Sequence, residues 1–502
     1  MLIADYPIIG KHLDRDFVND IFKEIENTKI PYMSNETIRL IKKYRRKDSK
    51  LNDVKSLWKS LLIDAISILK INDAREKIYD ELSNGKILTR EKFDKIRKIS
   101  SYGIDELGNY LDDFIDFESV LYGTEKHYRD HVNHVFQVWA IGLPTIEKNI
   151  RLNDDFSIDY KFNFHFEITK NKNLKISESE LWAMWIIIAL CHDLGYPIEK
   201  SSKINKQTKK IISHFGSIQF TELDYNFSIL NTFLVEKFLD IISSKVYRRE
   251  TTESIEARNH TENEKPNAEE MTTKKNVIEK AHPNFACTTF IQTKYRDKLS
   301  KSLEEYKHGI FSSLLLFKNL TYFLETDYYV GNEELKAEDA RQFYIRKEIL
   351  RSIAGHTCPK MYHIELNTLG FLLVLCDELQ EWNRPNFEAL VTISQENEPD
   401  VKILNLHFEE DKQIIHIEMR YITEDKPSSY EEYLIRSKFK NIHYLLRSAV
   451  NDIKRKITFQ WDMYVNKSKY QFIFNSNKVS LEQLKVNKID EKGLETNFDI
   501  YI

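Results

Sequence analysis

The sequence predicts a mainly α-helical protein with a smaller α+β domain at its C-terminal end. Glycine and proline are scarce, with 13 and 10 residues in 502, and these are the residues that most often interrupt helices. Long segments before residue 385 place apolar residues three and four positions apart, whereas several later segments alternate apolar and polar residues. This change of period divides the chain into a helical part and a part that contains strands.

The composition is that of a globular protein with a large core, because 41% of the residues are hydrophobic and 30% are charged. The net charge of −4 argues against a broadly basic nucleic-acid surface. No CxxC pair is present, so neither a cysteine zinc site nor a secreted disulfide framework is expected. The start, MLIADYPIIG, lacks the basic segment of a signal peptide, and the longest apolar run, LWAMWIIIAL, is too short to span a membrane. We expect a cytoplasmic protein.

Residues 1–115 are predicted to form an N-terminal helical region. The segment DVKSLWKSLLIDAISILKI has apolar residues at helical spacing, and SNETIRLIKKY begins with residues typical of a helix N-cap. No pattern in this region points to chemistry.

Residues 116–388 are predicted to form the central helical domain. The segments VNHVFQVWAIG and ELWAMWIIIAL are expected to be buried helices. Between them, alternation in FSIDYKFNFHFEI predicts an inserted hairpin at about 146–178. A polar stretch at about 246–279 is expected to be a flexible loop. Further helices are expected in KHGIFSSLLLFKN, ARQFYIRKEILRSIAGH and NTLGFLLVLCDELQEW.

Residues 389–502 are predicted to form the C-terminal α+β domain. The segments FEALVTISQ, VKILNLHFE and QIIHIEMRYI are typical of strands. The segment SSYEEYLIRSKFKNIHYLLRSAVNDIKRKI predicts a long amphipathic helix.

Histidine and aspartate residues stand at the apolar edges of several predicted helices. They are His131, His134, His192, Asp193, His308, His356 and Asp377. Helix caps or core histidines would explain some of them, but Asp377 lies in the apolar run FLLVLCDEL, where a carboxylate is costly unless it is paired or binds a metal. Imidazole and carboxylate together suit Mn, Fe, Co, Ni or Zn, and Mg less well. Such ions can lower the pKa of a bound water, so that hydroxide attacks a phosphate group.

The order of these residues resembles the HD superfamily of metal-dependent phosphohydrolases over about residues 118–385. The family pattern is a His on one helix, a His-Asp pair at the end of a later helix and an Asp on a distal helix. Many two-metal members add two histidines before the last Asp. The resemblance implies an HD-type helical core with one or two divalent transition-metal ions. The implied metal ligands are His134, His192, Asp193, His308, His356 and Asp377.

The first ligand stays open between His131 and His134. We favour His134, with His131 as a phosphate contact or proton donor. The planar guanidinium of Arg129 suits a phosphate group. Many family members have HDxGK, whereas this chain has HDLGYPIEK, so that Tyr196 takes the place of the lysine and Lys200 stands further along. His131, Arg129 and Lys200 are therefore the candidate catalytic residues.

The resemblance implies hydrolysis of a phosphate group of a nucleotide. Deoxynucleoside triphosphohydrolases, nucleotidases and cyclic-nucleotide phosphodiesterases all occur in the family. Two alternatives stay open: an HD-type single-strand nuclease, and a nucleotide-sensing regulatory protein that does not turn over its ligand. The expected partner is a small-molecule nucleotide. No membrane partner is expected, nucleic acid is less favoured, and self-association into a homo-oligomer stays open.

Overall fold

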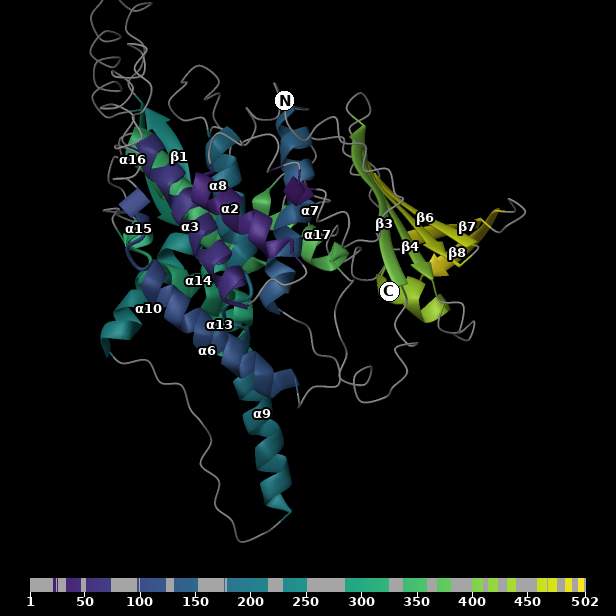
Figure 1. Cartoon of the computed structure of the whole chain (residues 1–502), viewed down its shortest axis with the longest axis horizontal. Helices are drawn as coiled ribbons and strands as arrows, with labels where there is room; N and C mark the ends of the chain where they lie inside the picture. The colour runs from purple at the N-terminus through teal and green to yellow at the C-terminus, as the bar shows by residue number, and fades with distance from the viewer. Residues whose placement is uncertain are drawn as a thin grey trace, which may run out of the picture.

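The computed structural model is mainly helical, with a small sheet near the C-terminus (Figure 1). The residues that it describes are 21–23, 25, 33–46, 51–73, 97–98, 100–122, 131–151, 176, 178–214, 229–250, 285–324, 337–358, 368–380, 400–409, 414–422, 431–438, 458–466, 468–475, 484–489 and 495–500.

The helical body contains helices drawn from the first three quarters of the chain. They are α2 (Asn35–Tyr44), α3 (Leu51–Asp73), α6 (Ile104–Tyr122), α7 (His131–Arg151), α8 (Glu178–Cys191), α9 (Tyr196–Ser213), α10 (Ile229–Ser243), α13 (Thr293–Glu304), α14 (His308–Asn319), α15 (Thr321–Leu324), α16 (Ala337–Gly355) and α17 (Leu369–Leu379). The strands are β1 (Ser244–Glu250), β2 (Phe285–Ile291), β3 (Asp400–Glu409), β4 (Ile414–Ile422), β5 (Thr458–Val465), β6 (Ser468–Asn475), β7 (Leu484–Ile489) and β8 (Glu495–Ile500).

Helix α8 lies at the centre of the helical body and contacts α3, α7, α14, α16 and α17. Its sequence, ELWAMWIIIALC, is apolar on every face, as expected for a helix that other helices surround. The indole N–H of Trp58 donates to the carbonyl of Leu190 at 2.9 Å, and that of Trp185 donates to the carbonyl of Trp139 at 3.0 Å. Trp58 and Trp185 therefore satisfy their indole N–H groups at the contacts that α8 makes with α3 and α7.

The N-terminal helices pack onto this body. Ser34 caps α2 as its sequence predicts, because its side chain accepts the Thr37 backbone N–H at 3.2 Å. The carboxylate of Asp64 in α3 accepts from the hydroxyl groups of Ser34 at 3.0 Å and Thr37 at 2.5 Å. The domain boundary expected at residues 115–116 falls inside α6, so the helical elements continue across it.

The sequence pattern does not predict the antiparallel pair of β1 and β2, which is in register from Ser244 with Ile291 to Glu250 with Phe285. The flexible loop expected at about 246–279 is therefore wrong for residues 246–250, and residues 251–279 lie outside the described ranges. Residues 146–151 of the expected hairpin belong to α7, and residues 152–175 are not described. In both places the local sequence is polar (YRRE and EKNIR), so its hydrophobic pattern does not predict the element.

The C-terminal sheet has six strands in the order β3-β4-β5-β6-β7-β8. Neighbouring strands are antiparallel except β4 and β5, which are parallel. The predicted strands VKILNLHFE and QIIHIEMRYI correspond to β3 and β4, whereas FEALVTISQ lies outside the described residues. The sequence predicts an α+β domain here but does not indicate the separate segments of β5 to β8.

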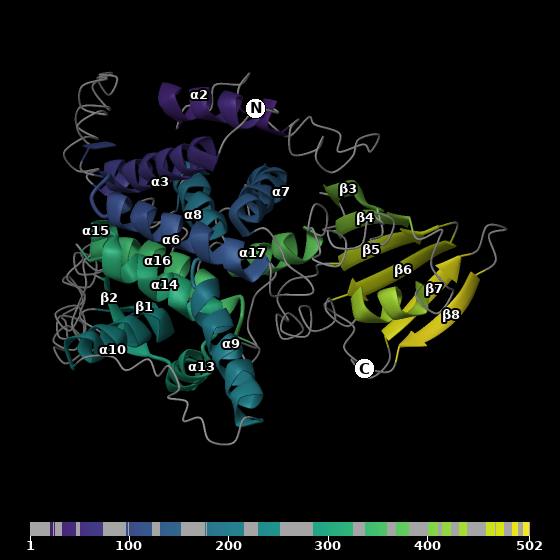
Figure 2. The same ribbon diagram turned by 60° about the horizontal axis from the view of Figure 1, so that its bottom comes forward.

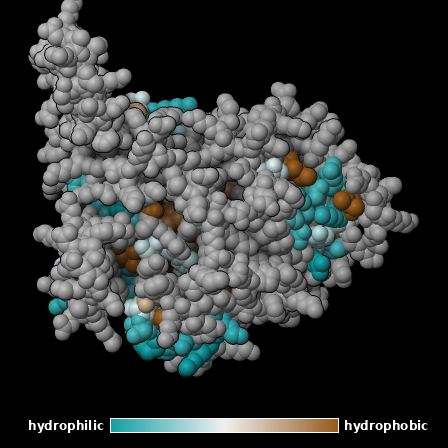
Figure 3. Space-filling view, turned by 90° about the horizontal axis from the view of Figure 1, so that it is seen from above, coloured by the Kyte–Doolittle hydropathy of each residue, from teal (hydrophilic) through white to brown (hydrophobic). Residues whose placement is uncertain are grey.

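Where side chains are described, in β4, β5 and β6, one face of the sheet is apolar and the other is polar. Trp461 and Met463 of β5 are buried on the apolar face, and residues 431–438, the beginning of the predicted long helix, are helical and bury Leu434 and Ile435. The described surface over the C-terminal domain is mostly hydrophilic, with a few hydrophobic side chains (Figure 3). Ile473 of β6 is 50% exposed.

One helical stretch of the described residues, Ser179–Ser213, is long and apolar enough to cross a membrane. Of its most apolar window, 83% is buried inside the structure. The central position of α8 among other helices explains this burial.

Candidate metal centre

The His192–Asp193 pair lies in the tight turn between α8 and α9. The backbone N–H of Gly195 donates to Ser312 Oγ at 2.7 Å, which ties this turn to α14. A Cβ atom at Gly195 would lie 2.6 Å from the backbone nitrogen of Ser312, so the absence of a side chain lets α14 pass close to the pair.

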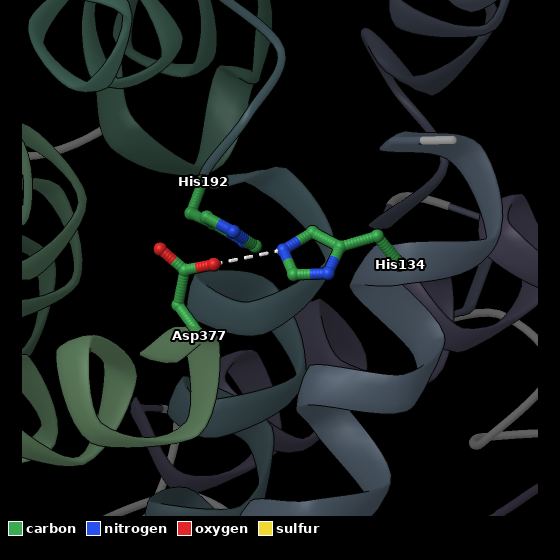
Figure 4. A group of neighbouring side chains, drawn as sticks. All are labelled: His134, His192 and Asp377. Carbon is green, nitrogen blue, oxygen red and sulfur yellow. Dashed lines mark ion pairs between the residues drawn. The ribbon is translucent and has the colours of Figure 1, made fainter. Parts of the chain in front are cut away.

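A first group of ligand-type side chains contains His134 of α7, His192 and Asp377 of α17, which point toward one another (Figure 4). His134 Nε2 lies 3.0 Å from Asp377 Oδ1 and 3.6 Å from Asp193 Oδ2. His192 Nε2 lies 3.2 Å from the same oxygen of Asp193. Segments far apart in the sequence therefore bring two imidazoles and two carboxylates together.

A second group contains His308, the first residue of α14, and His356, which follows α16. Their Nε2 atoms lie 3.2 Å and 3.8 Å from Asp193 Oδ1, and 3.2 Å from each other. Asp193 thus presents Oδ2 to the first group and Oδ1 to the second, so one carboxylate is shared by both.

Each of these four histidines has its Nδ1 atom held by an acceptor outside the cluster. The contacts are His134 with Gln380 Oε1 at 2.5 Å, His192 with the Ala189 carbonyl at 2.9 Å, His308 with Glu199 Oε2 at 2.7 Å, and His356 with the Ile353 carbonyl at 2.6 Å. These acceptors favour the proton on Nδ1 and direct Nε2 toward the shared carboxylate, which is how proteins orient histidine ligands of metals.

Burial and charge act in opposite directions on the pKa values of the cluster. Burial raises the pKa of Asp193, but His192, His308 and His356 outweigh it and hold this carboxyl well below its usual range. Burial lowers the pKa of His308, whereas hydrogen bonds to Asp193 and Glu199 raise it to about 9. Burial lowers the pKa of His356, and the neighbouring His308 and His192 lower it further. The metal-free protein therefore pairs the ionised carboxylate of Asp193 with a protonated His308.

These residues could hold a metal ion. The Nε2 atom of His192 is buried and makes no well-aligned hydrogen bond within the described residues, although it lies 3.2 Å from Asp193 Oδ2. With the proton on Nδ1, this atom carries a lone pair directed into the cluster, and a metal ion would satisfy it. Several imidazoles with two carboxylates form a donor set suited to such ions.

Two of the candidate catalytic residues lie beside the cluster. The His131 ring lies 3.8 Å from the Tyr196 ring and 6.4 Å from the His134 ring, measured between centroids. The Nζ atom of Lys200 lies 4.7 Å from the centroid of Tyr196. The contact between His134 and the cluster carboxylates favours His134 over His131 as the first ligand. Arg129 lies outside the described residues.

The N-terminal helices, for which the sequence shows no chemistry, contribute an apolar wall to this site. A cavity beside His131 and Asp193 is also lined by Trp58 of α3 and by Leu111 and Phe114 of α6. An apolar wall lowers the local dielectric constant, which strengthens the charge interactions of Asp193.

A further group that could hold a metal lies on the polar face of the C-terminal sheet and contains His416, Glu418 and Asp462. His416 Nε2 is 2.9 Å from Asp462 Oδ2, and Lys469 Nζ is 2.9 Å from the same oxygen. Burial raises the pKa of Asp462, but hydrogen bonds from His416 and Lys469 lower it to about 2. Because an ammonium group already neutralises this carboxylate, the sheet group is the weaker metal candidate.

Comparison with known proteins identifies no relative, since no family model, curated protein or solved structure matches the chain. The function is therefore argued from the geometry of the site.

Proposed function

We propose that the chain is an HD-type metal-dependent phosphohydrolase. The observation that carries this proposal is the shared carboxylate of Asp193. One of its oxygens faces His134 and His192, and the other faces His308 and His356. Asp377 joins the first pair. This arrangement suits two neighbouring ions, and its residues occur in the order that resembles the HD superfamily.

Charge balance favours a phosphate group as the ligand of the loaded centre. Two divalent ions supply an activated water and neutralise phosphate oxygens when they are bound. The described carboxylates that contact the cluster histidines are those of Asp193, Asp377 and Glu199. Three negative charges then face the four positive charges of two divalent ions. The remaining positive charge is complementary to an anion in a site with an apolar wall.

The first candidate substrate is a free nucleotide, whose phosphate group would face Asp193 from the side of His131. The imidazole of His131 is only 5% exposed and packs against Tyr196. This packing fixes the ring, so His131 is positioned to contact a phosphate oxygen or to pass a proton.

The second candidate substrate is single-stranded nucleic acid, and the position of α9 favours it. This helix begins beside the His-Asp pair and extends away from the helical body (Figure 2). Its outer half exposes Lys206, Lys209 and Lys210. Such a row of lysines can contact successive phosphates of a polymer.

The test combines metal binding with a substrate panel. Purified protein is loaded with Mn²⁺ and incubated with free nucleotides and with single-stranded DNA and RNA. The isosteric variant Asp193→Asn should lose both ions and all hydrolysis while keeping the circular dichroism spectrum of the wild type. An exposed carboxylate in α6 supplies the control, Asp105→Asn, which should behave as wild type. Absence of metal binding by the wild type would contradict the proposal.

The same panel separates the two substrates. Phosphate or pyrophosphate release from a nucleotide supports the first candidate. Cleavage of single strands alone supports the second, and the triple variant Lys206→Gln, Lys209→Gln, Lys210→Gln should then raise KM for the polymer without changing metal content.

A further inference from the structure

The second histidine pair differs from the first in the acceptor that holds its ring. Among the four cluster histidines, His134, His192 and His356 direct Nδ1 to a neutral amide or carbonyl oxygen. His308 alone directs Nδ1 to a carboxylate, that of Glu199, at 2.7 Å. The side chain of Glu199 is 14% exposed, so water screens this contact only in part.

The two groups also differ in the negative charge that they offer to an ion. The first group has the carboxylate of Asp377 together with Oδ2 of Asp193. The second group has only Oδ1 of Asp193 beside His308 and His356 among the described contacts. A carboxylate bonded to Nδ1 makes an imidazole a stronger ligand and adds negative charge behind it. Glu199 therefore supplies, through His308, part of the charge that the second group lacks.

Local structure explains why Glu199 can do this. It lies in the first turn of α9, and the hydrogen bond from Gly195 to Ser312 fixes the start of α9 against the start of α14. The same Glu199 oxygen accepts the backbone N–H of His308 at 3.1 Å, where the N-cap residue of α14 makes no side-chain cap. One carboxylate thus holds both the backbone and the ring of His308.

We propose that Glu199 is a positioning residue that fixes His308 and determines the affinity of the centre for its second metal ion. The inference rests on the proposed function, because it requires a metal centre at these residues. It adds that the two ions bind with different affinities, and that only the weaker one depends on Glu199.

The experiment measures Mn²⁺ binding to the full chain by calorimetry, with bound metal quantified by elemental analysis. The variants are Glu199→Gln, which keeps the shape and removes the charge, and Glu199→Asp, which keeps the charge on a shorter side chain. Glu36→Gln is the matched control, since Glu36 lies in the first turn of α2 and is exposed.

Wild type should bind two ions. Glu199→Gln should weaken binding of the second ion by about 10- to 100-fold and leave the affinity for the first ion unchanged. Glu199→Asp should lose less of the affinity for the second ion. Glu36→Gln should match wild type. If Glu199 served only as a cap of α14, Glu199→Gln would lower the melting temperature without changing either affinity, which would overturn the inference. A wild type that binds one ion would overturn the inference and keep a mononuclear phosphohydrolase, and a wild type that binds none would overturn the proposed function as well.

Discussion

Replacement of Gly309 by alanine tests whether close helix packing sets the geometry of the second histidine pair. Gly309 follows His308 in α14 and faces the end of α16. A Cβ atom there would lie 2.6 Å from the Ile353 carbonyl, 2.7 Å from Thr357 Oγ1 and 2.8 Å from His356 Nδ1. The Ile353 carbonyl and His356 Nδ1 form the hydrogen bond that orients His356, and Thr357 Oγ1 accepts the backbone N–H of Gly309 at 3.1 Å, so none of these atoms can move freely.

The size of the effect follows from these distances. To reach ordinary van der Waals contact at 3.4 Å, the Ile353 carbonyl must move away by 0.8 Å, which is 3.4 minus 2.6. This carbonyl accepts the bond from His356 Nδ1, so the imidazole moves with it. Metal–ligand distances tolerate only about 0.2 Å, and overpacking of this kind costs about 1–3 kcal/mol. We expect Gly309→Ala to weaken binding of the second ion at least as strongly as Glu199→Gln does. It should also lower the melting temperature.

The matched control is Gly370→Ala in the first turn of α17. A Cβ atom there would meet Ser352 at 3.5 Å, which is an ordinary contact, and alanine is more favourable than glycine within a helix by about 0.5–1 kcal/mol. This variant should keep both ions and the melting temperature of the wild type or a higher one. If calorimetry shows the same two affinities in both glycine variants, close packing at Gly309 does not determine the ligand geometry.

Two other predictions concern stability. In metal-free protein the pKa of His308 is raised from 6.5 to about 9, so its contribution of about 3 kcal/mol is complete below pH 6.5 and is lost as the pH rises to about 9. The melting temperature in EDTA should therefore fall over this range more steeply for the wild type than for His308→Gln, and equal slopes would contradict the assignment. Arg341→Met should lower the free energy of unfolding by about 3–5 kcal/mol, because it removes the guanidinium that pairs with the buried carboxylate of Glu180. Addition of Glu180→Gln should recover most of that loss in urea unfolding, whereas additive losses would show that the two side chains do not depend on each other.

The sequence predicts those parts of the fold for which one continuous segment carries the whole pattern, such as an apolar helix or a helix cap. The apolar segments of α3 and α8 and the cap at Ser34 belong to this class. Strands β1 and β2 do not, because thirty-four residues separate Glu250 from Phe285 and the backbone bonds between the strands do not depend on the polar side chains of β1. Pairing between distant segments leaves no local period to detect.

The candidate site divides in the same way. The His192–Asp193 pair and Asp377 can be singled out from the sequence because a carboxylate beside apolar residues needs a partner. Glu199 and Gln380 cannot, since such residues are common on solvent-exposed helix positions. Only the structure shows their contacts with His308 and His134.

The choice between His131 and His134 shows a further limit of sequence patterns. The two residues are three positions apart in α7, so they lie on neighbouring parts of one helix face. Both are buried, with 5% and 6% exposure. Spacing and burial are therefore nearly the same for both, and the contacts of the His134 ring with Asp377 and Asp193 separate them.

Without a metal ion, a proton on His308 offsets negative charge on Asp193. A bound ion would offset the same charge. Burial lowers the pKa of His192, but Asp193 and Asp377 outweigh it and raise it, and His308 is protonated on the other side of Asp193 at neutral pH. The charge of Asp193 is thus partly offset by protonated His308 without a metal, and α8 makes its contacts through Trp58 and Trp185 independently of the site. The helices can therefore pack before a metal ion binds, and this packing positions the ligand side chains. An ion that binds beside His308 must displace its proton, so metal affinity should rise with pH over the range in which the metal-free protein loses stability. Removal of metal should consequently change the pH dependence of stability and leave the fold intact at neutral pH.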